Sequence, residues 1–189
     1  RDKGFKSMAN VEFSIPKLVY GNNLDELQDG QFDDVVEALV DRLNMMGFTP
    51  RVENVPWWNV SSVHYAKNIR LVRGYTAQDV VSQLRKINVR RSFGHVNIQY
   101  PNTGDSISVR TKSYSVELYD KLAEVARDMG KDAAKEIRRS GNVIRLEVRL
   151  AKKPKLNSVF TQIGEAANPM FQDAYSEKVS KAVLRHHWD

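Results

Sequence analysis

The fold can be predicted from one stretch, Ser113-Tyr114-Ser115-Val116-Glu117-Leu118-Tyr119-Asp120-Lys121. Its side chains alternate, with Ser115, Glu117 and Tyr119 on one face of an extended chain and larger apolar residues on the other. Alternation with a period of two is typical of a strand that buries one face. A run with helical spacing follows at once, from residue 122 to residue 139. We therefore expect a strand that ends in a tyrosine on its polar face, with Lys121 two residues further on.

Two other segments, 93–100 and 142–150, repeat this design. Their polar faces carry His95, Asn97, Gln99, Arg145, Glu147 and Arg149. If these strands share one sheet, its polar face gathers a histidine, amides, carboxylates, guanidinium groups and a tyrosine hydroxyl. That mixture suits a divalent metal ion and a phosphodiester, whereas an ordinary solvated face would more often carry Thr, Lys, Glu and Ser.

The remaining patterns predict an α+β protein with about seven strands and four or five helices. Further strands are expected at residues 11–20, 48–53, 60–71 and 106–112, and helices at residues 29–46, 76–91, 122–139, 156–164 and 168–188. A turn at residues 101–105 makes the strands from 93 to 119 an antiparallel meander. Strands with one polar face imply a mostly antiparallel sheet with helices on one face and an open polar face carrying the active site. We expect a lead-in at residues 1–8 and one domain over residues 9–189.

Composition and charge narrow the function. The chain has 189 residues, of which 41% are hydrophobic, and this suffices for a core. Its net charge of +6 and pI near 9.5 favour a polyanionic partner, most simply nucleic acid, although many soluble proteins are mildly basic. The absence of cysteine excludes disulfides, thiolate zinc sites and cysteine nucleophiles. Because no apolar run approaches roughly 20 residues and no signal peptide is visible, we expect a cytoplasmic protein with no membrane partner.

Basic side chains on or near the predicted strands are candidates for binding DNA phosphates. They are Arg110, Lys112, Arg145, Arg149, Lys152, Lys153, Lys155, Lys67 and His64. Three of them belong to a basic turn predicted at residues 151–155. A single histidine on a strand, such as His64, is more often a hydrogen-bonded structural residue than a ligand.

Three motifs, in this order along the chain, resemble the replication initiators of filamentous phages and related plasmids. They are a His-hydrophobic-polar strand at His95, a Tyr-x-Lys strand end at Tyr119 and an Arg-x-Glu-x-Arg strand at Glu147. The stretches at residues 13–23 and 63–69 are also similar to that group. Its members start rolling-circle replication: a tyrosine attacks a phosphodiester at the origin, becomes linked to the 5′ phosphate and leaves a free 3′ hydroxyl.

The resemblance assigns roles by motif position. It implies that Tyr119 is the nucleophile, that Lys121 stabilises the phosphate or the phenolate, and that Glu147 is a metal ligand or a base. It also implies single-stranded or hairpin origin DNA as substrate, host replication proteins as candidate partners, and the cytoplasm of a bacterial host. The chain would then be a whole initiator or the N-terminal part of a longer one.

The family's metal motif departs from its usual form in this chain. The motif is His-hydrophobic-His, and here it reads His95-Val96-Asn97, so the second histidine is missing. Asn97 and Gln99 can offer amide oxygens instead, and oxygen ligands with one histidine suit Mg²⁺ or Mn²⁺. We expect His95, Glu147 and one of these amides to hold one ion, because neighbouring strands lie roughly 4.8 Å apart.

Two other functions fit the same residues. The first is a non-catalytic module that binds single-stranded nucleic acid across the polar face, and the second is metal-dependent hydrolysis without a covalent step. At the level of single residues, Tyr119 could be an ordinary strand-end tyrosine, and Glu147 could belong to a solvated ladder of charges with Arg145 and Arg149. A covalent adduct between DNA and Tyr119 would separate the nicking enzyme from all of these alternatives.

Overall fold

The computed structural model describes residues 9–86, 97–99, 106–138 and 141–188 of the chain. Contacts between Cα atoms divide the chain into two compact units, Arg1–Val52 and Glu53–Asp189. The sequence predicts a single domain over residues 9–189, and that number of domains stays a prediction. All the strands belong to the second unit.

The first unit is helical. It contains α1 (Ile15–Tyr20), the 3-10 helix η1 (Asp29–Gln31) and α2 (Phe32–Met45). The strand predicted at residues 11–20 is wrong, because Pro16 stands in the first turn of α1, where its missing N–H is not needed. Gly21 ends this helix with a φ of 71°. The helix predicted at residues 29–46 is confirmed, and its apolar stripe is buried.

The strand predicted at residues 48–53 is also wrong. Residues 48–51 belong to no helix or strand, and the 3-10 helix η2 (Val52–Trp57) follows them. Pro56 lies inside η2. A proline has no N–H for a strand ladder, so it outweighs a short alternation of apolar residues beside it.

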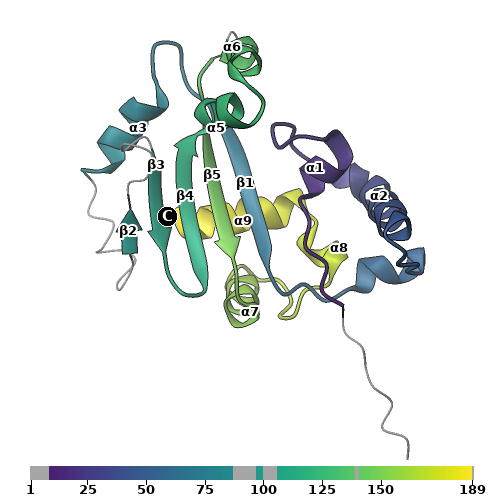
Figure 1. The fold of residues 1–189 in the computed structure, drawn as a ribbon. Coiled ribbons are helices and arrows are strands. Elements are labelled where there is room, and N and C mark those ends of the chain that lie inside the picture. Colours follow the sequence, from purple (N-terminus) through teal and green to yellow (C-terminus); the bar gives the residue numbers. More distant parts are fainter. Residues whose placement is uncertain (1–8, 87–96, 100–105, 139–140, 189) are drawn as a thin grey trace, which may run out of the picture. The chain divides into compact units, whose positions relative to one another are not determined.

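The second unit is built on one antiparallel sheet. Its strands are β1 (Val63–Arg70), β2 (Asn97–Gln99), β3 (Ser106–Arg110), β4 (Tyr114–Asp120) and β5 (Val143–Leu150). Their order in space is β1-β5-β4-β3-β2, and every neighbouring pair is antiparallel (Figure 1). The predicted α+β class and the meander from β2 to β4 are therefore confirmed. The described residues form five strands, not seven, since residues 11–20 and 48–53 contribute none.

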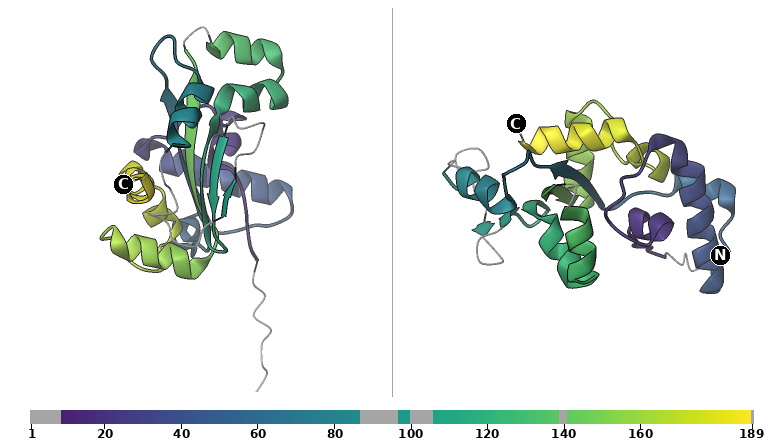
Figure 2. Two further views of the ribbon diagram at one scale, coloured as in Figure 1. Left: turned by 90° about the vertical axis from the view of Figure 1, so that its left-hand side faces the viewer. Right: turned by 90° about the horizontal axis from the view of Figure 1, so that it is seen from above.

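Helices cover the apolar face of the sheet. They are α3 (Ala77–Leu84), α7 (Lys153–Gln162), α8 (Phe171–Ala174) and α9 (Glu177–Trp188). Figure 2 shows α3, α7 and α9 on one side of the strands. Val116 and Val148 from the sheet are buried in one cluster with Phe160 and Val183 from the helices. Within the described residues, no helix combines the length and the apolar character needed to cross a membrane.

The first residues of α3 and α7 can be compared with what the sequence predicts there. The helix predicted at residues 76–91 begins as expected, since Thr76 is the N-cap of α3 and exchanges hydrogen bonds with Asp79 between side chain and backbone in a capping box. The predicted turn at residues 151–155 is instead mainly the beginning of α7, which starts at Lys153. Pro154 in the first turn of that helix suits a helix start as well as a turn.

Two short helices lie on the other side of the sheet. Asp120 accepts hydrogen bonds from two backbone N–H groups, so β4 passes directly into α5 (Lys121–Asp128), and α6 (Lys131–Arg138) follows. Both lie beside the polar face at the end where β4 ends (Figure 2). The prediction of helices on one face only is corrected at this end. Among the described helices of the second unit, only these two lie on the polar side.

The packing of α7 can be tested with a cavity. Phe160→Ala should lower the free energy of unfolding by about 3–5 kcal/mol, because the phenyl ring is 0% exposed and its removal leaves a void under the sheet. Met129→Ala is the control, since Met129 is 57% exposed and its loss should cost less than about 0.5 kcal/mol. Urea unfolding measures both. Equal losses in the two variants would contradict the position of α7 in the core.

Candidate active site

Antiparallel pairing brings polar side chains into three rows across the sheet, because residues paired directly opposite each other share a face. The first row, near the β3–β4 turn, is His64, Arg149, Ser115, Arg110 and Asn97. The middle row is Ala66, Glu147, Glu117, Ser108 and Gln99. The tyrosine row, near α5, is Asn68, Arg145, Tyr119 and Ser106. The predicted polar face is therefore a real surface of the sheet, and its charges are ordered along it.

Two carboxylates meet in the middle row. Glu117 of β4 is paired directly with Glu147 of β5, and their side chains are 13% and 10% exposed. Like charges directly opposite each other on adjacent strands are destabilising, and water screens them poorly at this burial. The pair therefore needs cations from the neighbouring rows.

Three arginines supply these cations. Arg149 donates from Nε to Glu147 Oε1 at 2.9 Å, and its Nη2 lies 3.3 Å from Glu117 Oε2. Arg110 donates from Nη2 to Glu117 Oε1 at 2.8 Å. Arg145 places its Nε 3.8 Å from Glu147 Oε2. Three guanidinium groups against two carboxylates leave this network with one net positive charge.

The hydroxyl of Tyr119 lies at the edge of the network. It donates a hydrogen bond to Glu147 Oε2 at 3.2 Å. Burial raises the pKa of Tyr119, and the negative charge of Glu147 raises it further, because both disfavour the phenolate. The positive charge of Arg145 opposes this shift. Tyr119 is therefore neutral at physiological pH, with a carboxylate placed to accept its proton.

Glu147 remains ionised in spite of its burial. Burial by itself would raise the pKa of Glu147, but the hydrogen bond from Arg149 and the charges of Arg149 and Arg145 outweigh it, so the pKa lies below its ordinary value. The imidazole of His64 lies nearby, with Nδ1 at 3.8 Å from Glu147 Oε1. The ionised carboxylate of Glu147 lies where it can accept the proton of the phenol, and its lowered pKa makes it a weaker base than an ordinary glutamate.

Lys121 is buried at the start of α5. Its amine forms an ion pair with Glu124, three residues further along the helix. Burial lowers the pKa of Lys121, and the hydrogen bond to Glu124 opposes this shift. The sequence predicts that Lys121 stabilises a phenolate or a phosphate. In the structure its hydrogen bond goes to Glu124, while its charge still acts on Arg145 and Glu147.

The strand order does not support the predicted one-ion metal site. Asn97 and Gln99 belong to β2, and β3 and β4 separate that strand from β5, which carries Glu147. Three strand spacings amount to roughly 14 Å, so the premise of adjacent strands is corrected. His95 lies outside the described residues. Among the residues that are described, no group of three or more His, Cys, Asp or Glu side chains is placed to hold a metal.

The predicted DNA-binding residues are divided between the two faces of the sheet. The polar face carries His64, Arg110, Arg145 and Arg149. Lys67 is paired with Leu146 and points to the opposite face. It stands three residues after His64 on the same strand, and successive residues of a strand alternate between the two faces. The amine of Lys155 lies 4.6 Å above the ring centre of Tyr114, which packs against the core. These two lysines therefore lie away from the polar face, and their contact with DNA stays a prediction.

The three other predicted lysines lie at one end of the sheet. Lys112 belongs to the β3–β4 turn, and Lys152 and Lys153 lie at the start of α7; all three are exposed. Each is within two to four positions of a first-row residue in the sequence. The end of the polar face that is furthest from α5 is therefore strongly basic.

Two acidic residues of the site were not among the predicted site residues. Glu117 lies two residues before Tyr119 on the same face, so alternation places it there, but its direct pairing with Glu147 depends on the register of β4 against β5. Glu124 stands three residues after Lys121, a spacing at which side chains meet on a helix. Their spacing from Tyr119 and Lys121 in the sequence would have been enough to include both glutamates among the predicted site residues.

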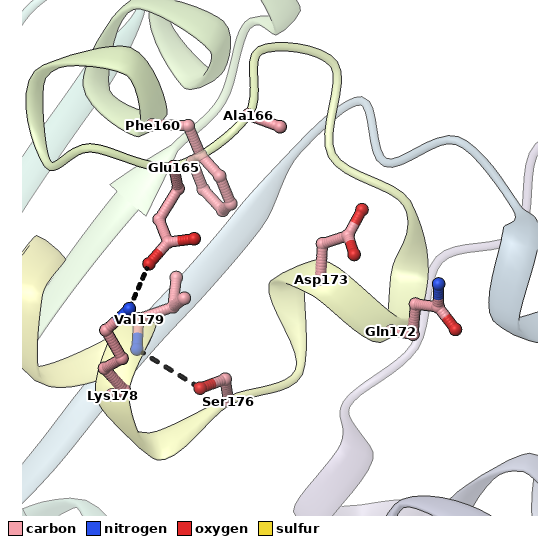
Figure 3. A pocket seen from close by; sticks show the side chains of 8 residues that line it. All are labelled: Phe160, Glu165, Ala166, Gln172, Asp173, Ser176, Lys178 and Val179. Atoms are coloured by element: carbon pink, nitrogen blue, oxygen red, sulfur yellow. Dashed lines mark hydrogen bonds and ion pairs between the residues drawn. The ribbon is translucent and has the colours of Figure 1, made fainter.

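A separate hollow of about 270 Å³ lies among α7, α8 and α9, away from the three rows (Figure 3). Its charged side chains serve the local fold. Lys178 donates to Glu165 at 2.8 Å, and Asp173 accepts a hydrogen bond from the backbone of Met170 at 2.9 Å. This hollow therefore offers less for chemistry than the polar face does.

No protein-family model, curated protein or solved structure matches this chain. The functional argument therefore depends on the geometry of the polar face and on the motifs themselves.

The charge network makes a prediction for acid stability. Because the pKa of Glu147 is lower in the folded protein than in the unfolded chain, its contribution to stability is present above the ordinary glutamate pKa and is lost as pH falls through the folded value. We expect acidification from pH 7 to pH 3 to destabilise the wild type more than Glu147→Gln, which cannot titrate at this position. Glu53→Gln, at an exposed glutamate, is the control and should follow the wild type. Urea unfolding at each pH measures the effect, and parallel curves for all three proteins would contradict it.

Proposed function

We propose that the polar face is the active site of an endonuclease that nicks and rejoins single-stranded or hairpin origin DNA, starting rolling-circle replication in the cytoplasm of a bacterial host. The observation that carries this proposal is the hydrogen bond from the Tyr119 hydroxyl to ionised Glu147 at 3.2 Å, inside a network of net positive charge. A phenol beside a base and cations is the arrangement expected of a tyrosine nucleophile. The motif resemblance supports the choice of reaction.

In the nicking step, the Tyr119 oxygen attacks the phosphorus while the hydroxyl proton passes to Glu147. The bond between phosphorus and the 3′ oxygen breaks, so the 5′ phosphate becomes linked to the tyrosine, and the 3′ oxygen takes a proton from solvent water and leaves as a hydroxyl. Because the pKa of Tyr119 is raised, the phenolate does not form in advance, and proton transfer accompanies the attack. Rejoining is the reverse of these steps.

Positive charge on the same face would stabilise the reacting phosphate. Arg145 is paired with Tyr119 across the β4–β5 register, and Lys121 begins α5 directly after β4, the strand of Tyr119. Charge that develops on the phosphoryl oxygens would be offset by these groups without reorganisation, because their positions are already set by Glu147 and Glu124.

A divalent metal, Mg²⁺ or Mn²⁺, belongs to the proposal through the motif that contains His95. A bound ion would polarise the scissile phosphate. The described residues do not form a ligand set for it, so the attack, the proton transfer and the charge stabilisation are assigned to Tyr119, Glu147, Arg145 and Lys121 alone.

The polar face suits catalysis better than passive binding of single strands. Binding modules of that kind stack bases on exposed aromatic side chains. Across the described residues of the three rows, Tyr119 is the one phenylalanine, tyrosine or tryptophan, and its hydroxyl is engaged by Glu147. Hydrolysis without a covalent step differs from the proposed reaction in that no adduct forms.

Tyr119→Phe tests the nucleophile. The substitution removes only the hydroxyl, so the fold should persist while the protein–DNA adduct disappears. The measurement is incubation with an origin oligonucleotide and Mn²⁺, followed by a search for a covalent adduct by denaturing electrophoresis and mass spectrometry. Tyr75→Phe, at an exposed tyrosine, is the matched control and should form the adduct at the normal rate. An adduct on the Tyr119→Phe protein would assign the chemistry to another residue.

Glu147→Gln tests the base. The amide keeps the size of the side chain but cannot take the proton, so the rate of nicking should fall about 10²- to 10⁴-fold, the usual contribution of general-base catalysis. Binding of the same oligonucleotide should weaken much less, because the three arginines remain. Single-turnover nicking and equilibrium binding are measured side by side. An unchanged single-turnover rate would remove Glu147 from the mechanism.

A further inference from the structure

An open hollow of about 310 Å³ lies on the polar face above Ser115, in the first row. Ser115 is paired with Arg149 of β5 on one side and with Arg110 of β3 on the other. A small hydroxyl side chain therefore stands between two guanidinium groups. His64, on the far side of Arg149, also lines the hollow.

The two guanidinium groups are fixed from below. Glu117 contacts both groups, each through a different carboxylate oxygen. Its Oε1 lies 2.8 Å from Arg110 Nη2, and its Oε2 lies 3.3 Å from Arg149 Nη2. A second anchor holds each Nε: Ser108 Oγ accepts from Arg110 at 2.7 Å, and Glu147 Oε1 accepts from Arg149 at 2.9 Å. These bonds use Nε and Nη2, and each guanidinium has further N–H donors on Nη1. The arginine side chains are still 50% and 38% exposed.

We propose that this hollow binds a phosphoryl oxyanion, and that the oxyanion is a backbone phosphate of a single DNA strand lying across the polar face. Arginine matches phosphate with paired N–H donors, and two arginines on either side of a hydroxyl offer such donors from both directions. Two guanidinium charges against one carboxylate leave the walls of the hollow positive. The identification of the strand as DNA rests on the proposed function.

The surroundings favour a phosphate that belongs to a chain over a free anion. Thr111 and Ala151 line the hollow, and the exposed residues Lys112 and Lys152 follow them directly in sequence, so positive charge continues past the rim. In the other direction, Tyr119 lies four residues beyond Ser115 on the same face of β4, about 13 Å away. One strand of DNA can therefore contact the hollow and the tyrosine together. The hollow would then determine which phosphate reaches Tyr119.

A matched pair of substitutions tests the site. Ser115→Asp places a carboxylate between the two arginines, whereas Ser115→Asn has almost the same shape and no charge. Both are made in a Tyr119→Phe background and measured without metal, so that binding is observed without nicking. We expect the affinity for a fluorescent single-stranded oligonucleotide to be roughly tenfold lower for Ser115→Asp than for Ser115→Asn. The slope of log affinity against log salt should be smaller by about 0.7, the value for one phosphate contact. Equal affinities and slopes would overturn the proposal.

The source of the phosphate is tested with oligonucleotides in which one phosphodiester at a time is replaced by a neutral methylphosphonate. One position should weaken binding to the Ser115→Asn protein and have no effect on the Ser115→Asp protein. Inorganic phosphate is the second probe. If it competes at the hollow while no single methylphosphonate matters, the site takes a free anion and the backbone assignment is wrong.

Two controls keep these results interpretable. Circular dichroism and thermal melting show whether both Ser115 variants fold. If Ser115→Asp does not fold, Arg110→Gln replaces it, with Arg127→Gln at an exposed position of α5 as its control; equal oligonucleotide affinities of these two would overturn the proposal. The adduct experiment on Tyr119 fails or succeeds separately, since it measures chemistry and these experiments measure binding.

Discussion

The candidate site depends on the pairing of Glu117 with Glu147 across β4 and β5. Two carboxylates that are nearly buried and directly opposite each other repel, and removing the cations around them would leave uncompensated charge in a poorly solvated place. Arg110, Arg145 and Arg149 are therefore held where they are by the same charges that need them. Each arginine is therefore paired with at least one carboxylate, and the charges of the polar face form one connected network.

The same register connects the site to the core. A slip of one residue between β4 and β5 would place Glu117 opposite Val148 or Val116 opposite Glu147, so that one strand turned its carboxylate toward the helices and its valine toward the polar side. The hydrophobic burial under α7 and α9 therefore disfavours any slip by an odd number of residues. In this way the apolar face stabilises the geometry of the face that would do the chemistry.

The two ends of the polar face are suited to different tasks. At the end near α5, Tyr119 contacts an ionised carboxylate, and burial and charge keep its own proton in place. At the other end, Ser115 stands between two partly exposed arginines, with lysines beyond them. A nucleophile at one end and an anion-binding hollow at the other are consistent with a single strand that lies along β4.

Strands and helices were predicted correctly from local sequence patterns where one physical preference dominated. Alternation predicted β4, β5 and most of β1, and the helix predicted to begin at residue 76 is α3, with Thr76 as its N-cap. Predictions failed where two preferences competed: Pro16 fits the first turn of a helix as well as an edge strand, and the helix was formed. Lys67 was grouped with His64 by charge, but residues three apart on a strand lie on opposite faces.

By itself, the sequence determined the α+β class, the antiparallel meander and the polar character of one sheet face, because periodicity and turn residues act over a few neighbours in the chain. Only the tertiary structure decided which polar residues meet. The order β1-β5-β4-β3-β2 places Glu147 beside Glu117 and Tyr119, and two strands, β4 and β3, separate it from β2, so the metal site expected with Asn97 and Gln99 loses its geometric basis. The physical reason is that strand neighbours are chosen by how the whole sheet buries its apolar face, and no local pattern in the sequence carries that information.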